Sequence, residues 1–342
     1  MSLPEGPWNE RWTFERLLSR HGGQGETYVV NDCVESSTFG VLKVLKEQKD
    51  SERRSRLFRE AKTLESLSGA DGIAELLDSN VDKYKEDDLL YIVTEYIEGT
   101  HPDNKMECDA ALDFTLALME ILVYCHEQLI VHRDIKPNNI VLHGGNPVEP
   151  YLIDFGLTFN HNAIDDLSTA AAQGIGPRNW FFLPEMAAGA EAQRFAVMDL
   201  THTLGVLFNV VTGLRPLLLR DEAGLKPHER PSAVLELQKL GIDLHSRLKF
   251  LFDIGFNYEI AERWKSADQV IEVVNSIRNR QNTKYQSQAR LNDAIQKYKK
   301  SDGYIRAGAL SHFYNVFVTT LERFSYGRIA ISAMPDESTC IL

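Results

Sequence analysis

Cysteine is scarce and scattered in this chain of 342 residues. The sequence holds four cysteines, at positions 33, 108, 125 and 340, and none of them forms a Cys-x-x-Cys pair. Disulfide-rich secreted domains and zinc sites place their cysteines in dense or regularly spaced sets. The sparse pattern therefore argues against both classes and favours reduced thiols inside a cell.

Long apolar runs and a leader-like beginning are also absent. No apolar stretch of the sequence approaches the about 20 residues that a membrane-spanning helix requires. The longest, residues 204–211, contains Asn209. The opening sequence, MSLPEGPWNE, has neither the basic segment nor the apolar segment of a secretory signal. We therefore expect a cytoplasmic protein without a membrane span.

Positive charge is not in excess. The chain has 37 Lys and Arg residues against 49 Asp and Glu residues, for a formal net charge of -12. This balance disfavours a protein that binds nucleic acid or an anionic membrane over its whole surface. The 43% hydrophobic and 25% charged residues are ordinary for a globular protein, and the length suits about two domains or lobes.

The pattern of apolar residues divides the chain into a strand-rich part and a helix-rich part. Short apolar runs bounded by turn residues predict strands at residues 12–18, 27–34, 37–45 and 89–94. Apolar residues at helical spacing predict helices at residues 52–68, 109–128 and 204–211. The last of these is apolar nearly all round, which indicates a buried helix. A hinge is expected near residues 95–105, where Gly and Pro occur.

The end of the chain has a different character. Residues 278–300 carry seven Lys and Arg residues against one Asp. Apolar residues then repeat at helical spacing, at Leu310, Phe313, Phe317, Leu321 and Phe324. We expect a helical extension whose apolar stripe packs on the large lobe while its basic face is solvated. The alternative is an element that regulates the protein or binds a regulatory partner.

Two motifs carry the chemical information. Residues 132–139 read HRDIKPNN, and Asp154-Phe155-Gly156 begins 15 residues after Asn139. The pair matches H-R-D-x-K-x-x-N followed by D-F-G, and the sequence resembles the eukaryotic-type (Hanks-type) serine/threonine protein kinases. Eight specified residues in one order make coincidence negligible.

The resemblance covers roughly residues 12–276 and implies an α+β, bilobal kinase fold. The parts it implies are an N-terminal tail at 1–11, an N-lobe of five strands and one main helix at 12–97, a mostly helical C-lobe at 98–276 and the helical extension at 277–342. ATP would lie in the cleft between the lobes.

The resemblance also implies how ATP is held. The turn RHGGQGETY at residues 20–28 takes the place of the phosphate-binding loop, with Arg20 at the first glycine position and Thr27 where Val is usual. Lys43 would reach the α- and β-phosphates and pair with Glu60, with Glu65 as the alternative partner. The residues implied to form the ATP site are Gly22, Gly23, Gly25, Thr27, Val41, Lys43, Glu60, Thr94, Glu95 and Ile97.

The same resemblance assigns the reacting groups. Asp134 would be the catalytic base for the substrate hydroxyl, and Lys136 would steady the γ-phosphate; a lysine at this position is typical of kinases that act on Ser and Thr. Asn139 and Asp154 would bind Mg²⁺ through oxygen atoms. Leu183-Pro184-Glu185 stands where A-P-E is expected, and Glu185 would form a structural ion pair with Arg263.

Several positions depart from the family pattern. Residues 176–181 lack the usual threonine, with Arg178 near its place, and Asp199 lies six residues before Gly205 instead of five. Arg133 beside Asp134 favours control by a phosphate on the activation segment, and Ser168 and Thr169 are the candidate autophosphorylation sites. The departures at residues 176–181 and at Asp199 concern recognition of the substrate more than the chemistry at the nucleotide.

We therefore expect an ATP- and Mg²⁺-dependent kinase that phosphorylates Ser or Thr of protein substrates. Two alternatives stay open on the sequence. One is a small-molecule kinase of the same broad fold, although such enzymes usually lack a Lys136-type residue and the Glu185–Arg263 pair. The other is a pseudokinase that serves as a scaffold.

Overall fold

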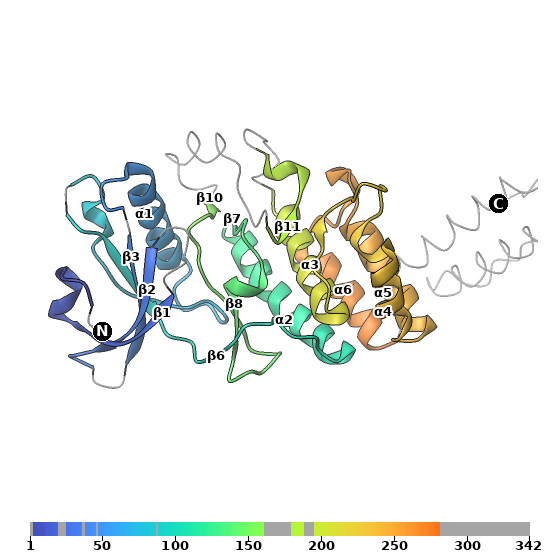
Figure 1. Cartoon of the computed structure of the whole chain (residues 1–342), viewed down its shortest axis with the longest axis horizontal. Helices are drawn as coiled ribbons and strands as arrows, with labels where there is room; N and C mark the ends of the chain where they lie inside the picture. The colour runs from blue at the N-terminus through green and yellow to red at the C-terminus, as the bar shows by residue number, and fades with distance from the viewer. Residues whose placement is uncertain are drawn as a thin grey trace, which may run out of the picture. The chain divides into compact units, whose positions relative to one another are not determined.

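The computed structural model describes residues 3–19, 25–35, 38–45, 47–86, 88–160, 179–187 and 195–280. The chain divides into two units, residues 1–278 and 279–342, and nearly all described residues belong to the first. Within this unit, Figure 1 shows a small lobe built on a sheet and a large lobe built from helices. The bilobal α+β fold expected from the sequence is confirmed. Among the described residues, no helix is both long and apolar enough to cross a membrane.

The small lobe is built on one antiparallel sheet with the strand order β1-β2-β3-β5-β4. Its strands are β1 (Trp12–Ser19), β2 (Gly25–Asp32), β3 (Phe39–Leu45), β4 (Leu76–Ser79) and β5 (Tyr91–Glu95). The register places Thr27 opposite Lys43 and Val41 opposite Thr94. Directly paired residues and alternate residues along a strand share a face, so Thr27, Val41, Lys43 and Thr94 lie on the same face of the sheet.

The opposite face of the sheet is covered by the beginning of the chain. Trp8, in a short 3₁₀ turn, is 1% exposed and packs edge-on against Tyr91 of β5. The indole of Trp12 donates to Asp78 at 2.8 Å, and Tyr91 donates to the same carboxylate. The sequence analysis treats residues 1–11 as a tail. In the structure this segment packs on the sheet from Leu3 on, because its apolar side chains cover a strand face that would otherwise meet solvent.

Helix α1 (Ser51–Ser66) packs against the face of the sheet that carries Lys43. Its N-cap is Asp50, whose carboxylate accepts from the main-chain N–H groups of Glu52 and Arg53. Leu57, Ala61 and Leu64 recur at helical spacing and are buried; the first two pack with Leu45 and Ile92 of the sheet. This packing determines which side chains of α1 face the lysine.

The large lobe consists mainly of helices. They are α2 (Cys108–Glu127), α3 (Val197–Thr212), α4 (Pro231–Gln238), α5 (Ile242–Gly255) and α6 (Ala267–Arg278). Helix α3 is buried along almost its whole length, which includes residues 204–211, predicted to be buried, and it ends at Gly213 with φ of 76°. Because α3 is enclosed by protein, it can serve as the rigid support for the loops around it.

Short strands join the helices of the large lobe. They are β6 (Gly99–Thr100), β7 (Ile130–Val131), β8 (Ile140–His143), β9 (Pro150–Leu152), β10 (Phe159–Asn160), β11 (Phe181–Phe182) and β12 (Leu217–Leu218). Strands β7 and β10 flank the two motif-bearing loops at residues 132–139 and 153–158, and they pair with each other. This pairing brings the loops together.

The end of α6 lies beyond the expected lobe boundary at residue 276. Ile277 is fully buried, and Arg278 forms an ion pair with Asp113 of α2. These contacts keep the helix in the first unit through Arg278, so the division falls two residues later than expected. The proposed extension, from residue 281 on, lies outside the described residues.

One arginine binds α1 to the loops beside it. Arg54 is buried, and all five of its guanidinium N–H groups donate to main-chain carbonyl oxygens at 2.5 to 3.0 Å. The acceptors are Gln48, Lys83, Tyr84, Glu86 and Asp88. Arg54 therefore connects the first turn of α1 to the segment between β4 and β5.

We predict that Arg54→Met lowers the free energy of unfolding by about 3 kcal/mol, because five main-chain carbonyls lose their charge-assisted hydrogen bonds to a buried guanidinium. Urea or thermal unfolding of the full chain would measure the change. The matched control is Arg53→Met on the same helix, since Arg53 makes long, partly exposed ion pairs with Glu47 and Asp50. That control should cost less than about 1 kcal/mol. Equal losses for the two variants would contradict the prediction.

Candidate active site

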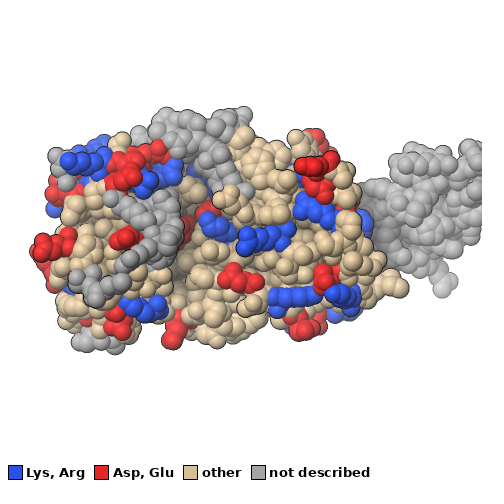
Figure 2. Space-filling model, in the orientation of Figure 1, with Lys and Arg blue, Asp and Glu red and all other residues tan. Residues whose placement is uncertain are grey.

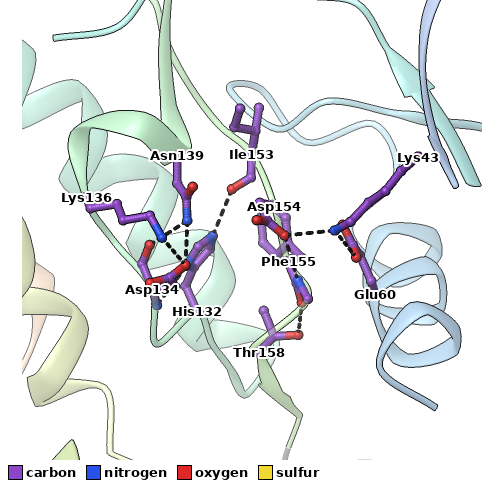
Figure 3. A network of polar contacts seen from close by, with 11 residues as sticks. Lys43, Glu60, His132, Asp134, Lys136, Asn139, Ile153, Asp154, Phe155 and Thr158 are labelled. Atoms are coloured by element: carbon purple, nitrogen blue, oxygen red, sulfur yellow. Dashed lines mark hydrogen bonds and ion pairs between the residues drawn. The ribbon is translucent and has the colours of Figure 1, made fainter. Parts of the chain in front are cut away.

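The centre of the site is a lysine between two carboxylates. Lys43 Nζ lies 2.7 and 2.9 Å from the carboxylate oxygens of Glu60 and 3.1 Å from Oδ1 of Asp154. Figure 3 shows Asp154 between Lys43 on one side and the loop of residues 132–139 on the other. The Lys43–Glu60 pair that the resemblance implies is present. Glu65, the alternative partner, instead pairs with Lys62 on the surface of α1.

The charges of this cluster depend on one another. Burial opposes the charged form of Lys43, but Asp154 and Glu60 outweigh it and raise the pKa of the lysine. Lys43 in turn lowers the pKa of Asp154 to about 2. Burial raises the pKa of Glu60, and the Lys43 ammonium opposes that rise. Asp154 is therefore ionised near neutral pH, and its side chain, 44% exposed, can accept a further cation.

The loop of residues 132–139 holds a second carboxylate in a different environment. Oδ2 of Asp134 accepts from Lys136 Nζ at 2.7 Å and from Asn139 Nδ2 at 2.9 Å. Within the described part of the chain, no group donates to its other oxygen, Oδ1, which is buried. Burial raises the pKa of Asp134, and the neighbouring Lys136 opposes the rise. One oxygen of Asp134 is thus held in position while the other can accept a proton.

His132 and Phe155 connect the two motif-bearing loops. The rings lie 4.8 Å apart, edge to face, and both residues are buried. Burial lowers the pKa of His132, which therefore favours its neutral form. Nδ1 accepts from the main-chain N–H of Asp134, so Nε2 carries the proton and donates to the carbonyl of Ile153 at 3.3 Å. The neutral imidazole thus bridges Asp134 and the residue before Asp154.

Arg133 connects the same loops from the other side. Its guanidinium donates to the carbonyls of Leu157 and Thr158 and lies over the ring of Phe159. Arg133 and Asp154 both have positive φ, 67° and 61°, which is an uncommon backbone conformation for residues other than glycine. The candidate phosphorylation sites that would interact with Arg133, Ser168 and Thr169, lie outside the described residues.

A buried aspartate of α3 holds the loop in place, and the sequence analysis missed this role. Asp199 accepts from the main-chain N–H groups of His132 and Arg133, each at 2.8 Å, and from His126 Nε2 at 3.1 Å. Asp199 lies one residue farther from Gly205 than the family pattern has it. Its carboxylate nevertheless accepts from both main-chain N–H groups. The available signal was a carboxylate a few residues before the apolar segment 204–211, since a carboxylate next to a buried helix needs buried partners.

The segment before α3 is held by the other expected ion pair. Glu185 and Arg263 form a bidentate, buried pair. Phe181 packs against Gly205 of α3, where a Cβ atom would come within 2.7 Å of the ring. Glycine at this position therefore permits the close approach. Arg178, noted as a departure from the family pattern, lies outside the described residues, as do Gly176 and Pro177.

The residues expected to contact ATP lie on one side of the small lobe, so far as the structure describes them. Thr27, Val41, Lys43 and Thr94 share a sheet face, and Glu95 and Ile97 follow at the end of β5. The N–H of Tyr96, between them, donates to the carbonyl of Phe39. Gly22 and Gly23 lie outside the described residues, and Gly25 is the first residue of β2. Figure 2 shows the surface hollowed between the lobes.

Side-chain oxygen atoms of Asn139 and Asp154 are suited to bind a hard cation. Asn139 uses its amide nitrogen for two bonds to Asp134, at 2.8 and 2.9 Å, so its amide oxygen is the atom left for a metal ion. Asp154 contributes a carboxylate that is ionised and partly exposed. An amide oxygen and a carboxylate are ligands that Mg²⁺ binds together with phosphate oxygens. The residues present therefore fit Mg²⁺.

Known proteins share this sequence pattern over much of the chain. A probable serine/threonine-protein kinase of Streptomyces coelicolor is 30% identical over 219 residues, which is 62% of this chain and 31% of the relative. PknA, a serine/threonine-protein kinase of a Nostoc species, is 26% identical over 74% of this chain and 45% of the relative. PrkC, a serine/threonine-protein kinase of Bacillus subtilis, is 29% identical over 57% of this chain and 29% of the relative. The chain thus spans less than half the length of these curated relatives.

The family itself is identified by a match to a family model. The sequence model of the protein kinase domain matches residues 18–246, a range that contains Lys43, Glu60, Asp134, Asn139 and Asp154. These are the residues that the structure brings together around Lys43 and Asp134. The chain therefore belongs to the protein kinase family.

Proposed function

We propose that this chain transfers the γ-phosphate of ATP to Ser or Thr hydroxyls of protein substrates, with Mg²⁺ as cofactor, and that it autophosphorylates at Ser168 or Thr169. Membership of the protein kinase family supports the nucleotide chemistry, since the family uses ATP and typically Mg²⁺. The names of the serine/threonine kinase relatives support the choice of acceptor.

The observation that carries the proposal is the asymmetric environment of Asp134. Lys136 and Asn139 hold Oδ2, while Oδ1 is buried and has no donor among the described residues. A base for phosphate transfer must keep one oxygen available for the proton of the attacking hydroxyl. The two bonds to Oδ2 restrict the orientation of the carboxylate and so direct Oδ1 toward that proton.

The remaining groups would hold and neutralise the nucleotide. Lys43, held by Glu60, would direct its ammonium to the α- and β-phosphates. Asn139 and Asp154 would bind Mg²⁺, which when bound neutralises charge on the phosphate oxygens. Lys136, whose Nζ lies 2.7 Å from Asp134, would contact the γ-phosphate beside the base. Phosphate transfer depends mainly on such positioning and charge neutralisation.

We predict that Asp134→Asn reduces phosphate transfer by about 10²- to 10⁴-fold while ATP binding is retained, because the amide has the shape of the carboxylate but cannot accept the proton. Radiolabelled γ-phosphate transfer to a protein mixture, and to the chain itself, measures the loss. Asp113→Asn on the surface of α2 is the matched control and should keep wild-type transfer. Full transfer by Asp134→Asn would contradict the role of Asp134 as base.

The same assay separates the proposal from its alternatives. A small-molecule kinase would label metabolites in a panel and leave proteins unlabelled. A pseudokinase would label neither, even where ATP and Mg²⁺ raise its melting temperature. Mapping of phosphopeptides from active wild-type protein tests autophosphorylation, and an unmodified Ser168 and Thr169 would exclude these two sites.

The pH dependence of transfer gives an independent prediction. Burial raises the pKa of Asp134, and Lys136 opposes that rise. The ionised carboxylate is the active form, so transfer is lost as pH falls through this pKa. Lys136→Met removes the opposing charge, so the pKa of Asp134 should rise. The acid limb of the profile of kcat/KM against pH should therefore move to higher pH, in addition to any loss in rate. Lys105→Met, which removes a surface lysine paired with Glu236, should leave the limb in place. If the acid limb of the Lys136→Met profile stays at the wild-type pH, the assignment of Asp134 as the base is contradicted.

A further inference from the structure

Thr158 lies at a junction between three parts of the site. It follows Gly156 by two residues, is 4% exposed, and its hydroxyl donates to the carbonyl of Phe155 at 2.7 Å. Its own carbonyl accepts from Arg133 at 3.1 Å. Figure 3 shows this side chain turned back toward Phe155. Thr158 thus closes the turn that begins at Asp154 and joins it to the loop that carries Asp134.

The third part is helix α1. Thr63 is 3% exposed, and its Oγ1 lies 3.3 Å from Oγ1 of Thr158. A hydroxyl has one proton to donate, and that of Thr158 goes to Phe155. Thr63 is therefore the donor in the bond between the two threonines, and Thr158 accepts. This buried polar contact joins residues 95 positions apart in the sequence.

The contact closes a ring around the charged cluster. Thr63 lies three residues after Glu60, on a neighbouring position of the same helix surface. Glu60 reaches Asp154 through Lys43, and Thr63 reaches the same turn through Thr158. Helix α1 and the Asp154 turn are thus joined at two points, one by ion pairs and one by a hydrogen bond. Two points of attachment fix the relative orientation of two elements better than one.

We propose that Thr158 and Thr63 are positioning residues that hold α1 and the Asp154 turn in a single arrangement. Their hydrogen bond keeps Glu60 at Lys43 and the Asp154 carboxylate at the metal-binding position at the same time. The inference rests on the proposed function, because the groups it positions are those that would bind ATP and Mg²⁺. The coupling itself is a property of the fold and can be measured without activity.

Hydrogen–deuterium exchange on the full chain tests the coupling directly. Thr63→Val should speed exchange of residues 154–158 about three- to tenfold, and Thr158→Val should speed exchange of α1 around Glu60 by a similar factor. Thr63→Ser and Thr158→Ser keep the hydroxyl and should restore slow exchange. The control is Thr115→Val in α2, because the buried hydroxyl of Thr115 donates to the carbonyl of Ala111 in its own helix. If each Val variant speeds exchange in its own element alone, the proposal is overturned.

A second readout connects the bond to the metal site. The Mg²⁺ concentration that gives half-maximal transfer should rise about three- to tenfold in either Val variant and stay near the wild-type value in the Ser variants. The Thr63→Val, Thr158→Val double variant should be no worse than Thr158→Val alone, because Thr158→Val already removes the bond between the two threonines, together with the bond to Phe155. A Val variant with a lower melting temperature but an unchanged Mg²⁺ requirement would show a merely structural role and overturn the proposal. The same holds if the effects of the two single Val variants add in the double variant.

The two hypotheses fail in different ways. If the wild-type chain transfers no phosphate, the proposed function is wrong, and the exchange experiment still decides whether α1 and the Asp154 turn are coupled. If the wild type is active and the Val variants match it in both measurements, the proposed function stands and the positioning role of the two threonines is wrong.

Discussion

The buried ammonium of Lys43 is the constraint on which the small lobe and the site depend. A charge enclosed in protein is tolerated only beside opposite charges, and here they come from two other elements: Glu60 of α1 and Asp154 of the loop after β9. The lysine is 13% exposed and lies on a strand, so the helix and the loop must approach the sheet for the cluster to form. Three features of α1 hold it against the sheet, where Glu60 can reach Lys43. They are the N-cap at Asp50, the apolar stripe and the hydrogen bonds of Arg54.

The large lobe supplies a complementary support. Helix α3 is enclosed on all sides, and its Asp199 accepts the main-chain N–H groups of His132 and Arg133, which sets the backbone of the loop next to Asp134. The two carboxylates of the site consequently differ in character. Lys43 lowers the pKa of Asp154 to about 2, which suits a ligand for a cation, whereas burial raises the pKa of Asp134, which suits a base. Their neighbours therefore shift the pKa values of the two aspartates in opposite directions.

The site residues that sequence reasoning identified are those whose types and spacing follow a short motif. The loop at 132–139, Asp154-Phe155-Gly156 and the Lys43–Glu60 pair are of this kind, and the structure brings their side chains together. Other contributions have no such local pattern. Arg54 is one of several arginines on α1, Trp8 precedes the first predicted strand, and Thr63 and Thr158 are ordinary residues in their own segments. Their importance follows from what lies next to them in space.

The sequence by itself determined the positions of four strands and three helical segments, the buried character of residues 204–211 and the chemical groups of the site, because these depend on periodicity and on residue types at fixed spacing. Tertiary structure decided that Glu60 and not Glu65 meets Lys43, since the packing of α1 turns one toward the sheet and the other toward solvent. It also decided that residues 3–11 cover a sheet face and that Asp199 supports the loop of residues 132–139. These outcomes depend on long-range packing and on which partners a buried polar group can reach, and neither is written in the neighbouring residues.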